Sequence, residues 1–141
     1  MKYVLDSCVA LKWVLTEADS PKAVAVRADY RNHLLELLVP DIFPVEVAHA
    51  LTRAERKGLI KPPQATRLLA DVLSTPMPFH PCQLLLARAV AISSAMRCGV
   101  YDCLYVALAE REGCEFITAD GKLVKNLGTQ FPFVISLAAM P

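Results

Sequence analysis

The chain opens with Lys2-Tyr3-Val4-Leu5, a short apolar run that predicts a strand and that stops at the polar pair Asp6-Ser7. Apolar residues then recur at helical spacing over residues 9–14, which predicts a helix. A strand, a turn and a helix in this order are the first part of the unit from which parallel sheets are built. The start of the chain therefore favours an α/β fold.

The rest of the chain repeats this alternation. Helical patterns cover about 20–37, 42–57, 63–73, 82–97 and 102–112, a short helix is expected after Asp120, and strands are predicted at 38–39, 77–79, 115–118 and 133–135. Asp41 is expected to cap the helix that starts at Ile42, and Gly58 to end it. We therefore predict an α/β fold in which helices cover both faces of a mostly parallel central sheet of about five short strands. No linker or repeat divides the chain, so residues 1–141 are expected to form one domain.

Composition excludes several classes of protein. The 141 residues are 55% hydrophobic and 21% charged, which excludes a disordered chain. The longest apolar run, Cys103 to Ala109, is far shorter than the roughly 20 residues of a membrane helix, and no secretory signal pattern follows Met1, so we expect a cytoplasmic protein. The net charge of +1 excludes binding of nucleic acid by overall charge alone. The five cysteines form no Cys-x-x-Cys pair and are expected to be reduced.

Four acidic residues stand in apolar surroundings: Asp6, Glu46, Asp102 and Asp120. A buried carboxylate is costly unless it is paired or bound to a cation, so each placement requires a partner. Asp6 and Asp120 follow strand ends, where ligands bind in open parallel sheets, and the other two lie near predicted helix starts. Because carboxylates alone repel one another, the cluster predicts a divalent cation, and all-oxygen ligands favour Mg²⁺ or Mn²⁺ over zinc. A structural role stays open, since Asp6 and Asp102 could each cap a helix.

The surroundings of these acids carry a family resemblance. Four stretches resemble the four signatures of PIN-domain ribonucleases, in the family's order: Tyr3-Val4-Leu5-Asp6-Ser7, Pro44-Val45-Glu46-Val47-Ala48-His49-Ala50-Leu51, Tyr101-Asp102-Cys103-Leu104-Tyr105-Val106-Ala107-Leu108-Ala109 and Ile117-Thr118-Ala119-Asp120. VapC-type toxins of toxin–antitoxin systems are the most similar subgroup. Each motif alone is weakly specific, whereas four in order are specific. The cysteines at positions 8 and 103, beside two of the acids, depart from the usual pattern without altering the carboxylates.

The resemblance implies a PIN-like nuclease fold and a metal-dependent endoribonuclease. Asp6, Glu46, Asp102 and Asp120 would hold one or two Mg²⁺ or Mn²⁺ ions for hydrolysis of RNA phosphodiesters to 5′-phosphate products. Ser7 and Thr118 are expected to hydrogen-bond to a carboxylate, a metal-bound water or a phosphate. The family also implies the toxin of a type II pair, a cognate VapB-type antitoxin and a homodimer.

Other residues have two interpretations each. The basic residues Arg53, Arg56, Lys57, Arg97 and Lys122 are candidates for contacts with the RNA backbone, although a solvated helix end explains the first three equally well. His49 is expected to orient or pack rather than to bind metal, and Cys8 and Cys103 to pack as inert thiols. The apolar residues of helix 63–73 indicate core burial or a partner face.

Two alternatives compete with the nuclease. A phosphatase with a nucleophilic aspartate is disfavoured, because such enzymes need a second aspartate two positions after the first, and Cys8 stands there. A catalytically inactive PIN-like module that binds RNA or acts as a scaffold would not need its acids, yet all four remain. The endoribonuclease is therefore the preferred hypothesis.

Overall fold

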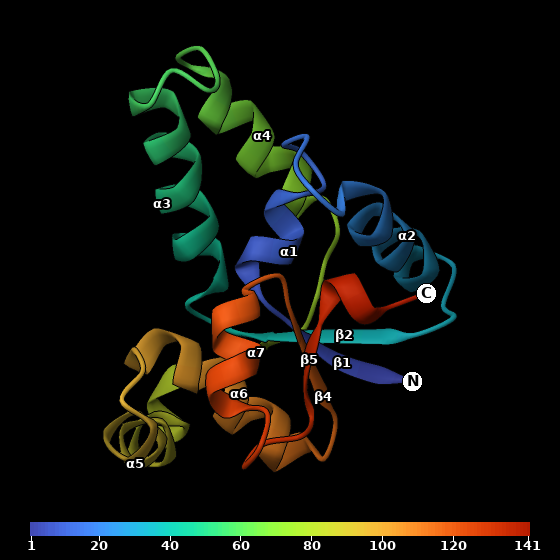
Figure 1. Ribbon diagram of the computed structural model, residues 1–141. Coiled ribbons are helices and arrows are strands. Elements are labelled where there is room, and N and C mark those ends of the chain that lie inside the picture. The colour runs from blue at the N-terminus through green and yellow to red at the C-terminus, as the bar shows by residue number, and fades with distance from the viewer.

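A computed structural model describes residues 1–141. Five strands form one parallel sheet in the order β3-β2-β1-β4-β5 (Figure 1). The strands are β1 (Lys2–Leu5), β2 (Glu36–Pro40), β3 (Phe79–His80), β4 (Glu115–Thr118) and β5 (Val134–Ser136). The helices are α1 (Ser7–Leu11), α2 (Ser20–Arg31), α3 (Phe43–Arg56), α4 (Gln64–Leu73), α5 (Leu86–Met96), α6 (Val100–Glu112) and α7 (Gly121–Leu127), with short 3₁₀ turns η1 (Cys82–Leu84) and η2 (Leu137–Ala139). The predicted fold class is confirmed.

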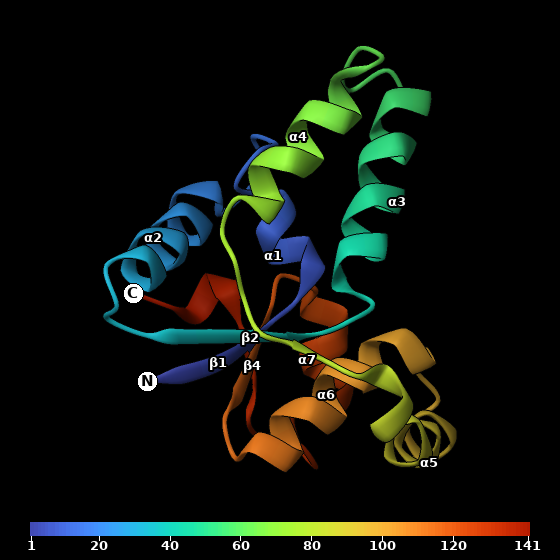
Figure 2. The same cartoon turned by 180° about the vertical axis from the view of Figure 1, so that it is seen from behind.

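The sheet separates two hydrophobic cores because successive side chains of a strand point to opposite faces. In β1, Tyr3 and Leu5 belong to a core with buried residues of α1, α2, α3 and α4, whereas Val4 belongs to a second core with α5, α6 and α7. Figure 2 shows these two groups of helices on either side of the sheet. Seven consecutive buried residues of α6, Cys103 to Ala109, explain why that stretch is apolar throughout.

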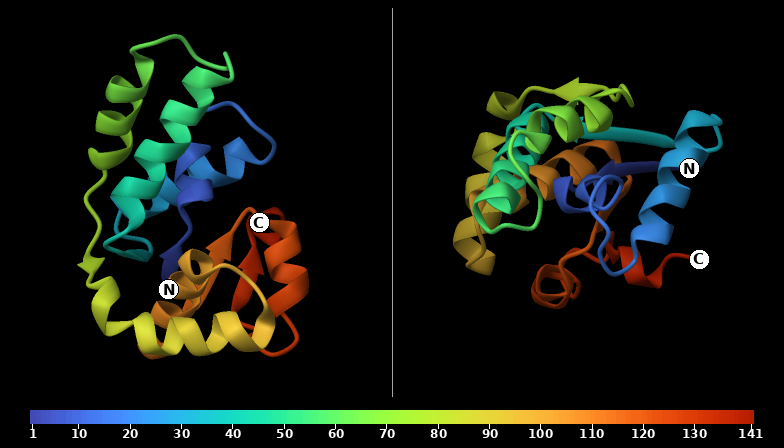
Figure 3. Two further views of the ribbon diagram at one scale, coloured as in Figure 1. Left: turned by 90° about the vertical axis from the view of Figure 1, so that its left-hand side faces the viewer. Right: turned by 90° about the horizontal axis from the view of Figure 1, so that it is seen from above.

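The pair α3 and α4 projects beyond the sheet (Figure 3). In α4, Val72 is buried, and Leu68 and Leu69 pack against the core from partly buried positions. Core burial therefore accounts for most of the apolar face predicted for this helix. No helix is both long and apolar enough to cross a membrane.

Two sequence predictions about helix ends were wrong. The helix predicted to reach residue 37 ends at Arg31, because His33 adopts a left-handed conformation with φ of 59° that turns the chain toward β2, which is longer than the predicted 38–39. Asp41 does not cap α3. Its Oδ1 accepts a hydrogen bond of 3.0 Å from the backbone N–H of Cys82, and α3 begins one residue after Ile42 with Pro44 in its first turn.

Smaller differences concern the middle of the chain. The third strand is Phe79–His80 rather than 77–79, and the helix predicted over 82–97 is divided into η1 and α5. Helix α6 begins at Val100, two residues before the predicted start. Asp102 therefore lies inside the first turn of α6 rather than at its first residue. All five cysteines are free.

Candidate functional site

The adjacent strands β1 and β4 bring two of the four acids to one edge of the sheet. Asp6 follows β1 directly, and its backbone N–H donates to the carbonyl of Ile117 in β4 at 3.0 Å. Asp120 lies two residues beyond the end of β4. The carboxyl ends of neighbouring parallel strands are where ligands bind in open α/β sheets. The structure thus has the strand adjacency that the predicted acidic cluster requires.

Asp6 is held by Thr118. The residue is only 6% exposed, and its Oδ2 accepts a hydrogen bond of 2.7 Å from the hydroxyl of the fully buried Thr118. The same hydroxyl accepts from the backbone N–H of Asp120 at 3.1 Å. Burial raises the pKa of Asp6, and the bond from Thr118 opposes that shift. Thr118 therefore fixes Asp6 relative to the loop that carries Asp120.

Glu46 enters from α3, where it lies in the first turn. Its Oε1 accepts a hydrogen bond of 2.6 Å from the hydroxyl of Tyr105 in α6. The hydroxyl of Ser7 lies between two acids, 3.4 Å from Oε1 of Glu46 and 3.5 Å from Oδ1 of Asp6. Burial raises the pKa of Glu46, the bond from Tyr105 lowers it, and the charge of Asp6 raises it.

Asp102 differs from the other three acids because no hydrogen bond stabilises its carboxylate. Burial raises the pKa of Asp102 to about 6, and the charges of Asp6, Asp120 and Glu46 add to the increase. Asp102 does not cap α6, whose N-cap is Gly99. Asp6 occupies the N-cap position of α1 without a capping side-chain bond. The capping alternative therefore fails for Asp102.

Asp120 does cap a helix. Its Oδ1 accepts from the backbone N–H groups of Lys122 at 3.0 Å and Leu123 at 3.2 Å, at the start of α7. The residue is exposed, and its other carboxylate oxygen accepts none of these bonds. Asp120 thus has a structural role that leaves one oxygen for a ligand.

The donor set is compatible with a hard divalent cation. None of the four carboxylates forms an ion pair with a basic side chain. No three His, Cys, Asp or Glu side chains stand close enough together to enclose one ion in this conformation. Mg²⁺ commonly binds through one or two carboxylates and keeps several waters, so it does not need such a cage. The oxygen-only set therefore fits Mg²⁺ or Mn²⁺ with solvent completing the coordination.

The two cysteines next to these acids are packed as expected. Burial raises the pKa of the Cys8 thiol well above its usual range, and Cys8 accepts a hydrogen bond of 3.3 Å from the backbone N–H of Ala119. Burial likewise raises the pKa of Cys103 to about 12, and its Sγ lies 3.2 Å from that of Cys98. Thiols with raised pKa values are poor nucleophiles and poor metal ligands.

A groove of about 610 Å³ includes one of the four acids, Glu46, in its lining. Ser7, Glu46 and His49 line it together with apolar residues that include Tyr101. A second hollow of about 270 Å³ shares Leu11, His49 and Ala50 with this groove and continues to two basic residues of α3, Arg53 and Lys57.

Of the basic residues predicted to contact RNA, Arg53 and Lys57 therefore lie along a path that leads to Glu46. Arg56 lines neither hollow. Lys122 lies in the first turn of α7 beside Asp120, and Arg97 is exposed at the end of α5. Arg53 and Lys57 thus line the hollow that adjoins the groove, whereas the other three basic residues line neither.

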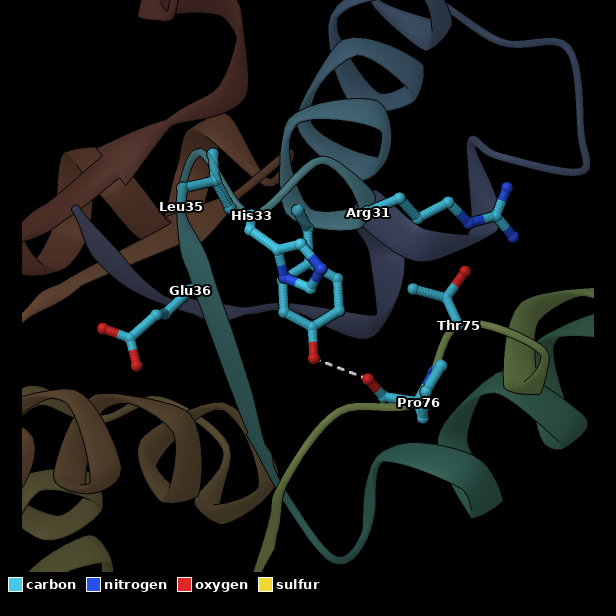
Figure 4. A pocket seen from close by; sticks show the side chains of 7 residues that line it. Arg31, His33, Leu35, Glu36, Thr75 and Pro76 are labelled. Atoms are coloured by element: carbon cyan, nitrogen blue, oxygen red, sulfur yellow. Dashed lines mark hydrogen bonds between the residues drawn. The ribbon is translucent and has the colours of Figure 1, made fainter.

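Another hollow, of about 350 Å³, lies beside the first residue of β2, at the amino edge of the sheet (Figure 4). Arg31, His33 and Glu36 line it, and the hydroxyl of Tyr30 donates to the carbonyl of Pro76 across it. It contains one carboxylate and none of the four acids described above. It therefore has no cluster of ligands for a cation.

Tyr105 was not among the residues predicted from the sequence. It lies in the apolar run of α6, where a tyrosine looks like any other core residue. A signal was present, because Tyr105 follows Asp102 by three residues, and residues three apart share a helix face. The contact with Glu46, 59 positions away, needs the tertiary structure.

Comparison with known proteins agrees with this geometry. The sequence model of the PIN domain family matches residues 3–126. Ribonuclease VapC3 of Pyrobaculum aerophilum is 30% identical over 139 residues, which cover 96% of this chain and 99% of that protein. Ribonuclease VapC12 of Mycobacterium tuberculosis is 33% identical over 125 residues, 89% of this chain and 92% of that one.

Solved structures share the fold. The crystal structure of PAE2754 from Pyrobaculum aerophilum superposes with a TM-score of 0.71 at 20% identity and covers 98% of this chain and 85% of that one. A chain in the crystal structure of VapBC2 from Rickettsia felis, bound to a DNA fragment from its promoter, superposes with a TM-score of 0.64 at 15% identity, over 96% of this chain and 97% of that one.

Proposed function

The chain belongs to the PIN-domain family, in which its relatives are VapC ribonucleases, and on that premise we propose that it is a Mg²⁺- or Mn²⁺-dependent endoribonuclease. Its substrate is RNA, and its cation ligands are Asp6, Glu46, Asp102 and Asp120. Residues 1–141 then serve as one nuclease domain.

One observation carries this proposal. Burial and the charges of three other carboxylates raise the pKa of Asp102 to about 6. No hydrogen bond or ion pair stabilises the charged form of this carboxylate. Such a residue weakens the fold unless a cation neutralises it. Strongly perturbed carboxylates without a structural partner are typical of functional sites.

Each residue of the proposed site has a separate role. When bound at these residues, a divalent cation would supply an activated water and would neutralise charge on the phosphate. Thr118 holds Asp6 in a fixed orientation, and Asp102 and Glu46 contribute free oxygens from α6 and α3. The Ser7 hydroxyl, between Asp6 and Glu46, is placed to hydrogen-bond to a water or a phosphate oxygen. Arg53 and Lys57 hold the RNA backbone farther along the groove.

The proposed partners follow from the family. The Rickettsia felis structure contains VapBC2, and we infer that this chain likewise is the toxin of a type II pair and binds a VapB-type antitoxin. We also propose a homodimer. The exposed apolar residues Leu86 and Val90 are four positions apart on α5 and offer a face for it.

The decisive experiment is cleavage of structured RNA by the purified chain with Mg²⁺ or Mn²⁺, compared with EDTA. Asp102→Asn keeps the shape and removes the charge, and Asp29→Asn, an exposed acid on α2, is the matched control. We expect cleavage that needs both the cation and Asp102 and that survives Asp29→Asn.

Undiminished cleavage by a folded Asp102→Asn variant contradicts the proposed role of Asp102. If the parent neither cleaves RNA nor binds Mn²⁺, the chain is instead the inactive RNA-binding or scaffolding module. A parent that binds Mn²⁺ without cleaving points to a specific RNA target absent from the assay.

A further inference from the structure

We propose that Tyr105 is a positioning residue of the cation site, and that its buried hydroxyl orients the carboxylate of Glu46 for the metal. This inference rests on the proposed function, because it assigns a task to Tyr105 at the same site. It concerns a residue that touches a ligand of the cation and not the cation itself.

The hydroxyl of Tyr105 occupies a fixed position. The residue is fully buried, and its ring stacks on Phe116 of β4 with centroids 5.5 Å apart and an interplanar angle of 18°. Side chains in close-packed cores sit in rotamer minima and interdigitate with few voids. The hydroxyl is therefore a rigid donor, and its bond of 2.6 Å to Oε1 of Glu46 is short.

The bond limits how Glu46 can turn. Oε1 accepts from Tyr105 and lies 3.4 Å from the hydroxyl of Ser7, whereas Oε2 accepts neither bond. A free glutamate side chain loses rotamer entropy when it is fixed. Tyr105 and Ser7 already hold one oxygen of Glu46. Binding of a cation to the other oxygen therefore causes a smaller loss of rotamer entropy.

The same bond links helices on opposite faces of the sheet. Glu46 belongs to α3, which packs in one core, and Tyr105 belongs to α6, which packs in the other. Asp102 precedes Tyr105 by three residues on the same helix face. The bond therefore fixes the position of Glu46 in α3 relative to Asp102 in α6.

The test is Mn²⁺ binding in the absence of RNA, measured by electron paramagnetic resonance of the free ion. Tyr105→Phe keeps the ring and its stack on Phe116 and removes only the donor. Loss of such a partner of a metal ligand lowers metal affinity about 10- to 100-fold, so we expect the Kd for Mn²⁺ to rise by about tenfold. Tyr3→Phe is the matched control, because it removes the hydroxyl of a buried tyrosine at the other end of β1, where its partner is the sulfur of Met1.

A double-mutant comparison separates positioning from general damage. If Tyr105 acts through Glu46, the tenfold effect of Tyr105→Phe disappears in a Glu46→Gln background. The inference is overturned if Tyr105→Phe binds Mn²⁺ like the parent, or if it weakens binding equally in both backgrounds; either result leaves the proposed function intact. Failure of the parent itself to bind Mn²⁺ overturns both.

Discussion

Asp102→Asn should stabilise the fold at neutral pH when divalent cations are removed. The pKa of Asp102 rises from 3.8 to about 6, mainly through burial. A shift of about 2 units corresponds to about 3 kcal/mol at full weight, and solvent screening at this partly exposed carboxyl reduces the expected effect to about 1 kcal/mol. Because the folded state raises the pKa of an acid, the penalty is absent below about pH 4, grows between pH 4 and 6, and is complete above pH 6.

The assay is urea unfolding in EDTA at pH 4 and at pH 7.5. We expect Asp102→Asn to be more stable than the parent by about 1 kcal/mol at pH 7.5 and nearly equal to it at pH 4. Added Mn²⁺ should reverse the order, since a ligand at 100 times its Kd stabilises the parent by about 2.7 kcal/mol. Asp29→Asn should show none of these differences. A variant that is less stable than the parent in EDTA at pH 7.5 refutes the claim that Asp102 is an uncompensated charge.

Three other predictions follow from the contacts. Thr118→Val leaves the buried carboxylate of Asp6 without its 2.7 Å hydrogen bond and should destabilise the fold by about 1.5–3 kcal/mol in urea unfolding at pH 7.5, whereas Thr118→Ser should restore most of the loss. Replacing Arg53 and Lys57 together by alanine should weaken RNA binding and reduce the slope of log K against log salt by about 1.4, with kcat unchanged; an unaltered slope excludes both from the RNA path. Leu86→Glu should convert the proposed homodimer to a monomer in light scattering, and an unchanged mass rejects the α5 face.

The sequence predicted the parts of this fold that depend on local pattern. Alternating strands and helices predicted the parallel sheet, and apolar runs such as Val4-Leu5 and Phe116-Ile117 lie in the sheet as buried strands. The order of strands in the sheet is not a local property. From the sequence alone, Asp6 and Asp120 are expected to lie close together only if the strands before them are neighbours. The structure shows that β1 and β4 are paired.

The errors have a common physical origin in competition between local and tertiary contacts. Asp41 is of a residue type that commonly caps helices, but its carboxylate instead accepts a hydrogen bond from the backbone N–H of Cys82, 41 positions away. The helix predicted to reach residue 37 gives way to β2, because Glu36 and Leu37 pair with Lys2 and Tyr3 of β1 and Leu37 is buried in the core. Tyr105 was missed for the same reason, since its polar contact is with a distant residue.

The four acids are unequal, and this inequality supports the proposed cation site over a set of purely structural carboxylates. Thr118 satisfies Asp6, Tyr105 satisfies one oxygen of Glu46, and Asp120 caps α7 with one oxygen. Each of these three therefore has a hydrogen-bond partner in the fold whether or not a cation binds. Asp102 has no such partner, and its charge opposes folding. A carboxylate that costs stability and has no partner in the protein is explained by a ligand, so Asp102 is the residue at which loss of activity and gain of stability should coincide.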